Sequence, residues 1–225
     1  MAMKKFVNAS ETLVNDLLQG FSLAHRDKIA LAGNNLVVRK APKAADKVAL
    51  VTLGGSGHEP ALSGFVGEGL LDISVPGEIF AAPGPPRVVE ALRLAKRDAG
   101  ILFIVLNHAG DVMSADMAEE MAAAEGIKLR RVLTHEDISS GSRQDPSDRR
   151  GLAGCLAVYK VAGAAAEMGK SLDECAEIAE RLERNMGTLA VAVSGATHPA
   201  TGQVIAEVPE GQMVVGMGQH GEAGG

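Results

Sequence analysis

The sequence predicts an α/β fold. We expect a three-layer α/β/α domain around a mainly parallel sheet, followed by the start of a second, strand-rich α/β domain. Short apolar runs at residues 47–53 and 100–106 each end in a polar loop that contains glycine. Segments with helical spacing, such as 87–95 and 114–125, separate or follow these runs. Strand, helix and strand at this spacing favour parallel pairing with right-handed crossovers.

The first predicted elements are a helix and a buried strand. Ser10 is an N-cap candidate for a helix that we expect to end near Gly20. Residues 47–53 form the first strand. We expect a short helix over 59–68, with Pro60 early in it, and a short strand or turn over 72–80.

Helices and strands then alternate up to about residue 186. Residues 139–150 are polar and predict an exposed loop, and Ser171 begins a capping box. The predicted helices are 87–95, 114–125, 151–168 and 171–184, and the predicted strands are 100–106 and 127–133.

The pattern changes after residue 186. Successive strands without helices indicate a second unit. We therefore divide the chain into a first α/β domain, 1–186, with the glycine loop and Asp111, and the beginning of a second domain, 187–225, with His220. About forty residues are too few for an independent core, so we expect the front part of a longer protein. The predicted strands are 188–194, 203–208 and 212–218.

Composition argues against several classes of protein. A net charge of −6 disfavours non-specific binding to phosphate backbones, and one Tyr, five Phe and no Trp disfavour base stacking. We therefore expect no nucleic-acid partner. No apolar run approaches a membrane span and the N-terminus lacks a signal-peptide pattern, so we expect no membrane partner and a cytoplasmic location. Cys155 and Cys175 are expected to be free core thiols, with an oxidised pair as the alternative.

Three predicted strand ends combine glycine with ionisable groups, at residues 54–59, 107–111 and 219–225. Taken singly, each has a structural explanation as good as a functional one. The glycines could serve only a turn, Asp111 could only cap a helix, and His220 could lie on the surface. Together, a carboxylate, two imidazoles and a set of backbone amides favour a polar pocket.

Familiar motifs fit the glycine loop poorly. No Gly-Lys-Ser/Thr follows it, the dinucleotide fingerprint lacks its third glycine, and the order is not that of a nucleophile elbow. The histidines show no zinc spacing with the cysteines. We expect His108, His135 and His198 to support a site or lie on the surface, and His25 to be a surface residue.

Four motifs occur in one order and spacing: 54–60 (Gly-Gly-Ser-Gly-His-Glu-Pro), 110–113 (Gly-Asp-Val-Met), 149–154 (Arg-Arg-Gly-Leu-Ala-Gly) and 220–222 (His-Gly-Glu). Together they resemble the substrate-binding subunit of the dihydroxyacetone kinase family. The resemblance runs from Lys4 to the end of the chain.

This resemblance implies a ketose kinase component. His220 would attack the ketone carbon of a short ketose and form a covalent hemiaminal, and Asp111 would act as general base on the terminal hydroxyl. His58 would polarise the substrate oxygen. The substrate-binding residues would be Gly54, Gly55, Ser56, Gly57 and Asn107.

The resemblance also implies a partner. This chain would bind no cofactor or metal of its own, and Mg²⁺ with ADP or ATP would be held by a separate helical subunit or domain. We also expect a homodimer. Two alternatives remain: a non-catalytic ketose sensor of the same family, and a nucleotide-binding fold of unrelated function.

Several positions depart from the family pattern, mostly in the loops that would form the site. We infer an altered substrate shape, such as a four-carbon ketose or a branched keto sugar. The departures are Leu53 for glycine, Leu106, His108 and Ala109 for lysine, tyrosine and threonine, a changed stretch at 195–199, Gln219 for an aliphatic residue and Ala223 for proline.

Overall fold

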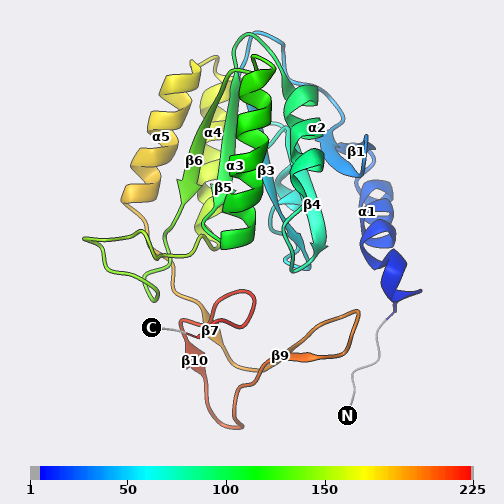
Figure 1. Ribbon diagram of the computed structural model, residues 1–225, viewed down its shortest axis with the longest axis vertical. Helices are drawn as coiled ribbons and strands as arrows, with labels where there is room; N and C mark the ends of the chain where they lie inside the picture. The colour runs from blue at the N-terminus through cyan, green and yellow to red at the C-terminus, as the bar shows by residue number, and fades with distance from the viewer. Residues whose placement is uncertain (1–5, 224–225) are drawn as a thin grey trace.

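The computed structural model describes residues 6–223 and contains a six-stranded sheet with helices on both faces (Figure 1). The strand order is β1-β2-β4-β3-β5-β6. β5 is buried at every position, which is why it reads in the sequence as an unbroken apolar run. The predicted three-layer fold with a mainly parallel sheet is confirmed. The parallel strands are β3 (Ala49–Ser56), β4 (Ile73–Ile79), β5 (Ile101–Leu106) and β6 (Leu129–Thr134).

An antiparallel hairpin forms one edge of the sheet. It consists of β1 (Ile29–Ala32) and β2 (Leu36–Arg39), and β2 also pairs antiparallel with β4. The strand predicted over 47–53 corresponds to β3, whereas the hairpin that precedes it was not predicted. Strands of four residues are too short to produce a clear alternating pattern.

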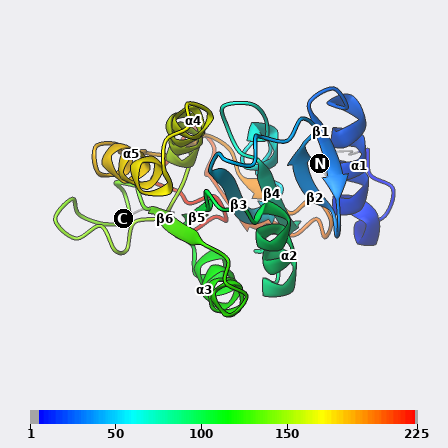
Figure 2. The same cartoon turned by 90° about the horizontal axis from the view of Figure 1, so that it is seen from above.

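Helices cover the two faces of the sheet (Figure 2). α1 lies at the β1 edge and contributes Val14 and Leu18 to the same core as α4 and α5. Among the residues described, no helix is long and apolar enough to cross a membrane. One face carries α2 (Pro85–Ala95) and α3 (Ala109–Ala124), and the other carries α4 (Gly154–Glu167) and α5 (Leu172–Arg184), with α1 (Leu13–Ala24) at its edge.

The chain changes direction across the sheet at β3. From β3 it passes to β4 on one side, and after α2 it returns to β5 on the other side of β3. The carboxyl end of β3 is therefore a topological switch point, where diverging connections leave a crevice. The segments that follow β3, β4 and β5 meet at this edge.

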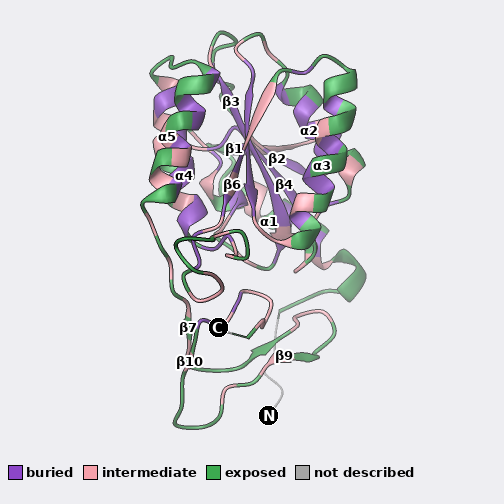
Figure 3. Cartoon of the chain, turned by 60° about the vertical axis from the view of Figure 1, so that its left-hand side comes forward, coloured by how far each residue is buried: buried purple, intermediate pink, exposed green. Residues whose placement is uncertain are grey.

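Residues 187–223 lie beyond this same edge (Figures 1 and 3). Their strands are two or three residues long, shorter than predicted, and largely exposed. Within the described chain, neither hydrophobic core includes a residue after Met186. Polar contacts with the main body therefore hold much of this segment. β7 (Val191–Ala192) pairs with β10 (Val214–Val215), and β8 (Ala196–Thr197) pairs with β9 (Val204–Ala206).

Two helix ends differ from the prediction. α1 continues through Gly20 to Ala24, because Phe21 packs against the core and outweighs the roughly 1 kcal/mol cost of a helical glycine. α3 begins at Ala109 rather than near 114, which brings Asp111 into its first turn. Acidic residues are favoured there by the helix dipole.

The helix predicted over 59–68 is absent. This stretch instead forms turns and a single 3₁₀ turn, η2 (Ser63–Phe65). Leu62 has φ +64°, which lies outside the right-handed helical region and interrupts any helix there.

Two predictions about side chains and caps are confirmed. Cys155 and Cys175 are free and buried, and burial raises the pKa of Cys155 to about 12. The capping box at Ser171 is formed with Glu174 at the start of α5.

Candidate functional site

A cavity of about 370 Å³ lies at the carboxyl ends of β3, β4 and β5. This volume is near the lower limit for small-molecule sites, about 300–1,000 Å³. The three predicted loops meet at this cavity, together with the turn after β4. The residues that line it include Gly55, Phe80, His108, Asp111, His220 and Glu222.

Of the four glycine-loop residues predicted to bind substrate, only Gly55 lines the cavity. A Cβ added to Gly55 would lie 2.7 Å from the backbone nitrogen of Ala81. Glycine therefore lets the end of β3 approach the turn after β4. A Cβ on Gly54 would instead collide with the buried side chain of Leu62.

The other two loop residues make contacts within the protein. Ser56 is buried, and its Oγ donates to the carbonyl oxygen of Gly77 at 2.8 Å. Gly57 has φ +100° and donates its N–H to Glu59 Oε2 at 2.9 Å. The loop thus shapes the cavity wall more than it supplies amides to the cavity.

Asn107 is turned away from the cavity. Its Nδ2 donates to the carbonyl oxygens of Ser147 at 3.0 Å and Arg149 at 2.6 Å. This side chain fixes the 139–150 loop beside the end of β5. The structure does not bring Asn107 together with the other predicted site residues.

Asp111 lines the cavity from the first turn of α3 and is only 6% exposed. Burial raises its pKa to about 7. Within the described residues, its Oδ1 has no hydrogen-bond partner. A carboxyl group with this pKa and a free oxygen can take up a proton from a ligand at neutral pH.

His58 contacts His220 across the sheet edge. Their Nε2 atoms are 3.1 Å apart and the two rings pack edge to face. Burial, together with the neighbouring His220, lowers the pKa of His58 to about 4. His58 is therefore neutral at pH 7, and one of the two facing nitrogens carries the shared proton.

Glu222 holds the imidazole of His220. Its Oε1 lies 3.0 Å from His220 Nδ1, and its Oε2 accepts the backbone N–H of His220 at 2.9 Å. Burial acts to raise the pKa of Glu222, but these hydrogen bonds outweigh it and lower the pKa overall. A carboxylate on Nδ1 favours the tautomer with its lone pair on Nε2. The only sequence signal for this role was its position two residues after His220.

His108 is a cavity residue that was not among the predicted site residues. Its Nε2 lies 2.8 Å from the carbonyl oxygen of Gly151 and 3.1 Å from Nε2 of Gln219. Its ring packs edge to face on His220, with centroids 5.1 Å apart. Burial lowers its pKa. The structure places this histidine on the cavity wall.

Phe80 is a second cavity residue that the sequence did not reveal. It follows β4 with φ +57°, and its ring packs near His58, His198 and His220. An isolated phenylalanine in a turn carries no motif. Its part in the site becomes visible only when β3 and β4 are paired.

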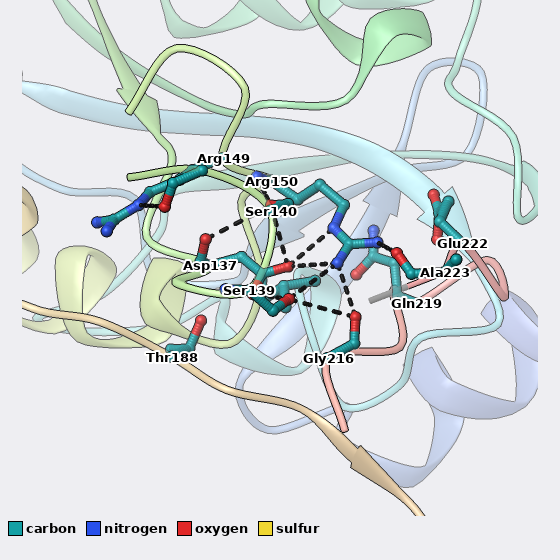
Figure 4. A network of polar contacts seen from close by, with 12 residues as sticks. Asp137, Ser139, Ser140, Arg149, Arg150, Thr188, Gly216, Gln219, Glu222 and Ala223 are labelled. Carbon is teal, nitrogen blue, oxygen red and sulfur yellow. Dashed lines mark hydrogen bonds and ion pairs between the residues drawn. The ribbon is translucent and has the colours of Figure 1, made fainter. Parts of the chain in front are cut away.

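Arg150 joins the C-terminal segment to the main body (Figure 4). Its guanidinium pairs with Asp137, which is fully buried, through Nε at 2.8 Å and Nη2 at 2.7 Å. Nη2 also donates to the carbonyl oxygen of Gly216 at 2.8 Å, and Nη1 to that of Ala223 at 3.4 Å. These contacts lie on both sides of His220 along the chain.

The loop predicted to be exposed over 139–150 therefore ends in a buried ion pair. The Arg150 side chain is 11% exposed. Ser139 extends the network, since its Oγ donates to Asp137 Oδ1 at 2.7 Å and to the carbonyl oxygen of Gly216 at 3.2 Å. Burial acts to raise the pKa of Asp137, but the bonds from Ser139 and Arg150 lower it overall.

Comparison with known proteins shows the family of the chain. The family model "Dak1 domain" matches residues 19–225. The chain is 40% identical to the dihydroxyacetone-binding subunit DhaK of a PTS-dependent dihydroxyacetone kinase from Lactococcus lactis, over all of this chain and 68% of that protein. It is 39% identical to L-erythrulose kinase of Pectobacterium atrosepticum, over 99% of this chain and 38% of that enzyme.

The chain is also similar to solved structures of dihydroxyacetone kinases. The dihydroxyacetone kinase from C. freundii, in complex with AMP-PNP and Mg²⁺, superposes with a TM-score of 0.90 at 34% identity, over 99% of this chain and 42% of that chain. The chain thus spans about two thirds of the Lactococcus subunit and less than half of this kinase. The chain belongs to the Dak1 domain family, which includes the dihydroxyacetone-binding subunits of dihydroxyacetone kinases.

Proposed function

We propose that this chain is the substrate-binding component of a dihydroxyacetone-kinase-type enzyme and binds a short ketose covalently on His220. The observation that carries the proposal is the arrangement around one cavity: an imidazole held by Glu222 faces the same space as the buried carboxyl group of Asp111. One group suits addition to a carbonyl, and the other suits removal of a hydroxyl proton.

The proposed adduct forms by addition across the ketone. Nε2 of His220 donates its lone pair to the carbonyl carbon, and the C=O π bond opens onto oxygen. The Nδ1 proton leaves through Glu222 and solvent, and the oxygen ends as a hydroxyl group, so no other reactant is needed. His58, whose Nε2 lies 3.1 Å from His220 Nε2, is placed to hydrogen-bond that oxygen.

The second proposed step is phosphoryl transfer to the terminal hydroxyl of the bound ketose. Asp111 accepts the hydroxyl proton as the oxygen attacks the phosphorus of the phosphoryl donor held by the partner, and the bond from phosphorus to that donor breaks, so that the dephosphorylated donor leaves. Such reactions depend mainly on positioning and charge stabilisation, and a covalently anchored substrate supplies the positioning. A ketone is required for anchoring, so polyols of similar size are excluded.

We propose that a partner subunit or domain supplies Mg²⁺ and nucleotide. Among the described residues, the sole cluster of potential metal ligands is His108, His220 and Glu222, and it occupies the ketose cavity itself. The similar C. freundii kinase, described with AMP-PNP and Mg²⁺, is more than twice as long as this match.

The proposed substrate is dihydroxyacetone or a related short ketose, and we expect the altered loops to favour a ketose of four carbons or a branched one. The changed side chains support this, because His108 replaces the tyrosine of the family pattern directly on the cavity wall. The similarity to an L-erythrulose kinase also supports a four-carbon ketose. Dihydroxyacetone as the clearly best substrate in a panel of ketoses would contradict this.

The covalent step is tested by intact-protein mass spectrometry under non-denaturing conditions after incubation with each ketose. We expect a mass increase of one ketose per chain in the wild type and none in His220→Ala. His25→Ala is the matched control, since His25 is an exposed histidine outside the site. A mass increase that persists in His220→Ala would refute His220 as the anchor.

We also propose that two copies of the chain associate. Met113, Met117 and Met121 recur at helical spacing on α3 and are 65%, 51% and 42% exposed. A stripe of exposed apolar side chains supports an interface there. We expect a dimer in sedimentation analysis and a monomer after Met117→Lys. Equal sedimentation of the two proteins would exclude this surface.

A further inference from the structure

Three side chains that could bind a metal ion line the cavity close to one another. His108 lies at the N-cap of α3, and His220 and Glu222 come from the C-terminal segment. One potential ligand atom from each lies within 4.8 Å of the other two. His220 Nδ1 and Glu222 Oε1 are 3.0 Å apart. Adjacent ligands of a tetrahedral ion with bonds of about 2.0–2.2 Å are separated by roughly 3.3–3.6 Å, so a small shift of either side chain would open this pair to an ion.

The surroundings resemble those of known metal sites. Metal-binding histidines usually have their second ring nitrogen held by a carbonyl or carboxylate oxygen. His108 has this support, because its Nε2 contacts the carbonyl oxygen of Gly151 at 2.8 Å, which leaves Nδ1 free. Asp111, only 6% exposed, also lines the cavity with an unpartnered oxygen.

We propose that His108, His220 and Glu222 bind a divalent transition metal ion, which competes with the ketose for His220. Two imidazoles and one carboxylate suit Zn²⁺, Co²⁺ or Ni²⁺, whereas Mg²⁺ prefers oxygen ligands alone. Metal on Nε2 of His220 occupies the lone pair needed for addition. Metal on Nδ1 leaves the proton on Nε2, so addition is blocked there as well.

The resemblance described above implies tyrosine at the position of His108, and a chain with that residue would supply only two of the three ligands. Metal binding by itself does not depend on the proposed function. The competition does, because it requires that His220 forms the adduct.

The direct test is titration of the purified, tag-free protein with Co²⁺, followed by the visible absorption of the bound ion, and with Zn²⁺ by calorimetry. We expect one ion per chain in the wild type. His108→Tyr, which restores the family residue, should weaken binding by at least about 10-fold, since even changes to residues behind the ligands cost 10–100-fold. His25→Gln should bind as the wild type does.

Two results would overturn the proposal: no saturable binding in the wild type, or equal affinity in wild type, His108→Tyr and His220→Ala. The competition is tested separately by adding Zn²⁺ before the ketose. We expect adduct formation to fall and to recover with EDTA, and undiminished adduct at saturating Zn²⁺ would refute competition. If the wild type binds metal but forms no adduct with any ketose, the proposed metal site stands and the proposed function is refuted.

Discussion

Replacing Asp111 by Asn is expected to lower the rate of ketose phosphorylation by about 10²–10⁴-fold, the usual contribution of a general base. Asparagine keeps the shape of the side chain but cannot accept the hydroxyl proton. The His220 adduct should still form, because Asp111 takes no part in carbonyl addition. The rate of phosphorylation is measured in the presence of the nucleotide-binding partner. The adduct is measured as the increase in the mass of the intact protein.

The pKa of Asp111 adds a pH dependence to this prediction. Because the folded carboxyl group has a pKa of about 7, wild-type activity should fall as pH decreases through 7. The unfolded group titrates near 3.8, so between about pH 4 and 7 the folded protein binds more protons than the unfolded chain. Stability therefore falls as pH rises through this window, by as much as about 4 kcal/mol.

The stability change separates a functional from a structural role. The asparagine side chain carries no charge, so Asp111→Asn should be at least as stable as the wild type at pH 8 while losing activity. Asp116→Asn is the matched control, since Asp116 lies on the same helix with its side chain 54% exposed. Retention of more than a tenth of the activity in Asp111→Asn would contradict the assignment. An adduct in the wild type with no phosphorylation at all would favour the sensor alternative.

The sheet was predictable because its central strands are buried on both faces. Ile101–Leu106 carries no polar residue, and the polar loop that follows marks its carboxyl end. The β1–β2 hairpin and the turns at 59–68 were not predictable, because short edge strands and left-handed residues leave little trace in a single sequence. Asp111 and His220 were singled out as ionisable residues in glycine-containing loops at predicted strand ends, and the four motifs in register supplied their expected roles.

The remainder of the site depends on contacts between distant parts of the chain. His108 and Gln219 are 111 residues apart, and Arg150 and Gly216 are 66 apart. Nothing in the local sequence marks either pair. His108 looked like a supporting or surface histidine because its neighbours come from the C-terminal segment, whose position no pattern in the sequence could define.

Replacing Arg150 by Ala is expected to detach the segment that carries His220. The change removes the donors to the carbonyl oxygens of Gly216 and Ala223 and leaves the fully buried carboxylate of Asp137 without its cation. Breaking one partner of a buried ion pair typically costs about 3–5 kcal/mol. The described part of the segment contributes nothing to either hydrophobic core, so this loss has little to compensate it.

We expect the apparent KM for the ketose to rise by at least about 10-fold, with a smaller change in kcat. The reason is that the variant loses binding free energy that positions His220, whereas the groups that act in the chemical step are unchanged. Hydrogen exchange should increase over residues 213–223 and remain unchanged in β5. Arg149→Ala is the matched control: its neighbouring guanidinium bonds only to the carbonyl oxygen of Gly141 among the described residues. Arg150→Lys should recover part of the affinity, because lysine restores the charge beside Asp137 but not the forked hydrogen bonds.

Ser139→Ala tests the same clamp without uncovering a buried charge. It removes the hydroxyl that bridges Asp137 and Gly216 but leaves the Arg150–Asp137 pair in place. We expect a smaller KM increase and faster exchange over the same residues. If Arg150→Ala folds and keeps wild-type exchange at 213–223 and a wild-type KM, Arg150 does not position His220. The clamp matters because Asp111 is fixed by a helix of the main body, whereas the segment that carries His220 is held to that body by polar contacts, among them those of Arg150 and Ser139.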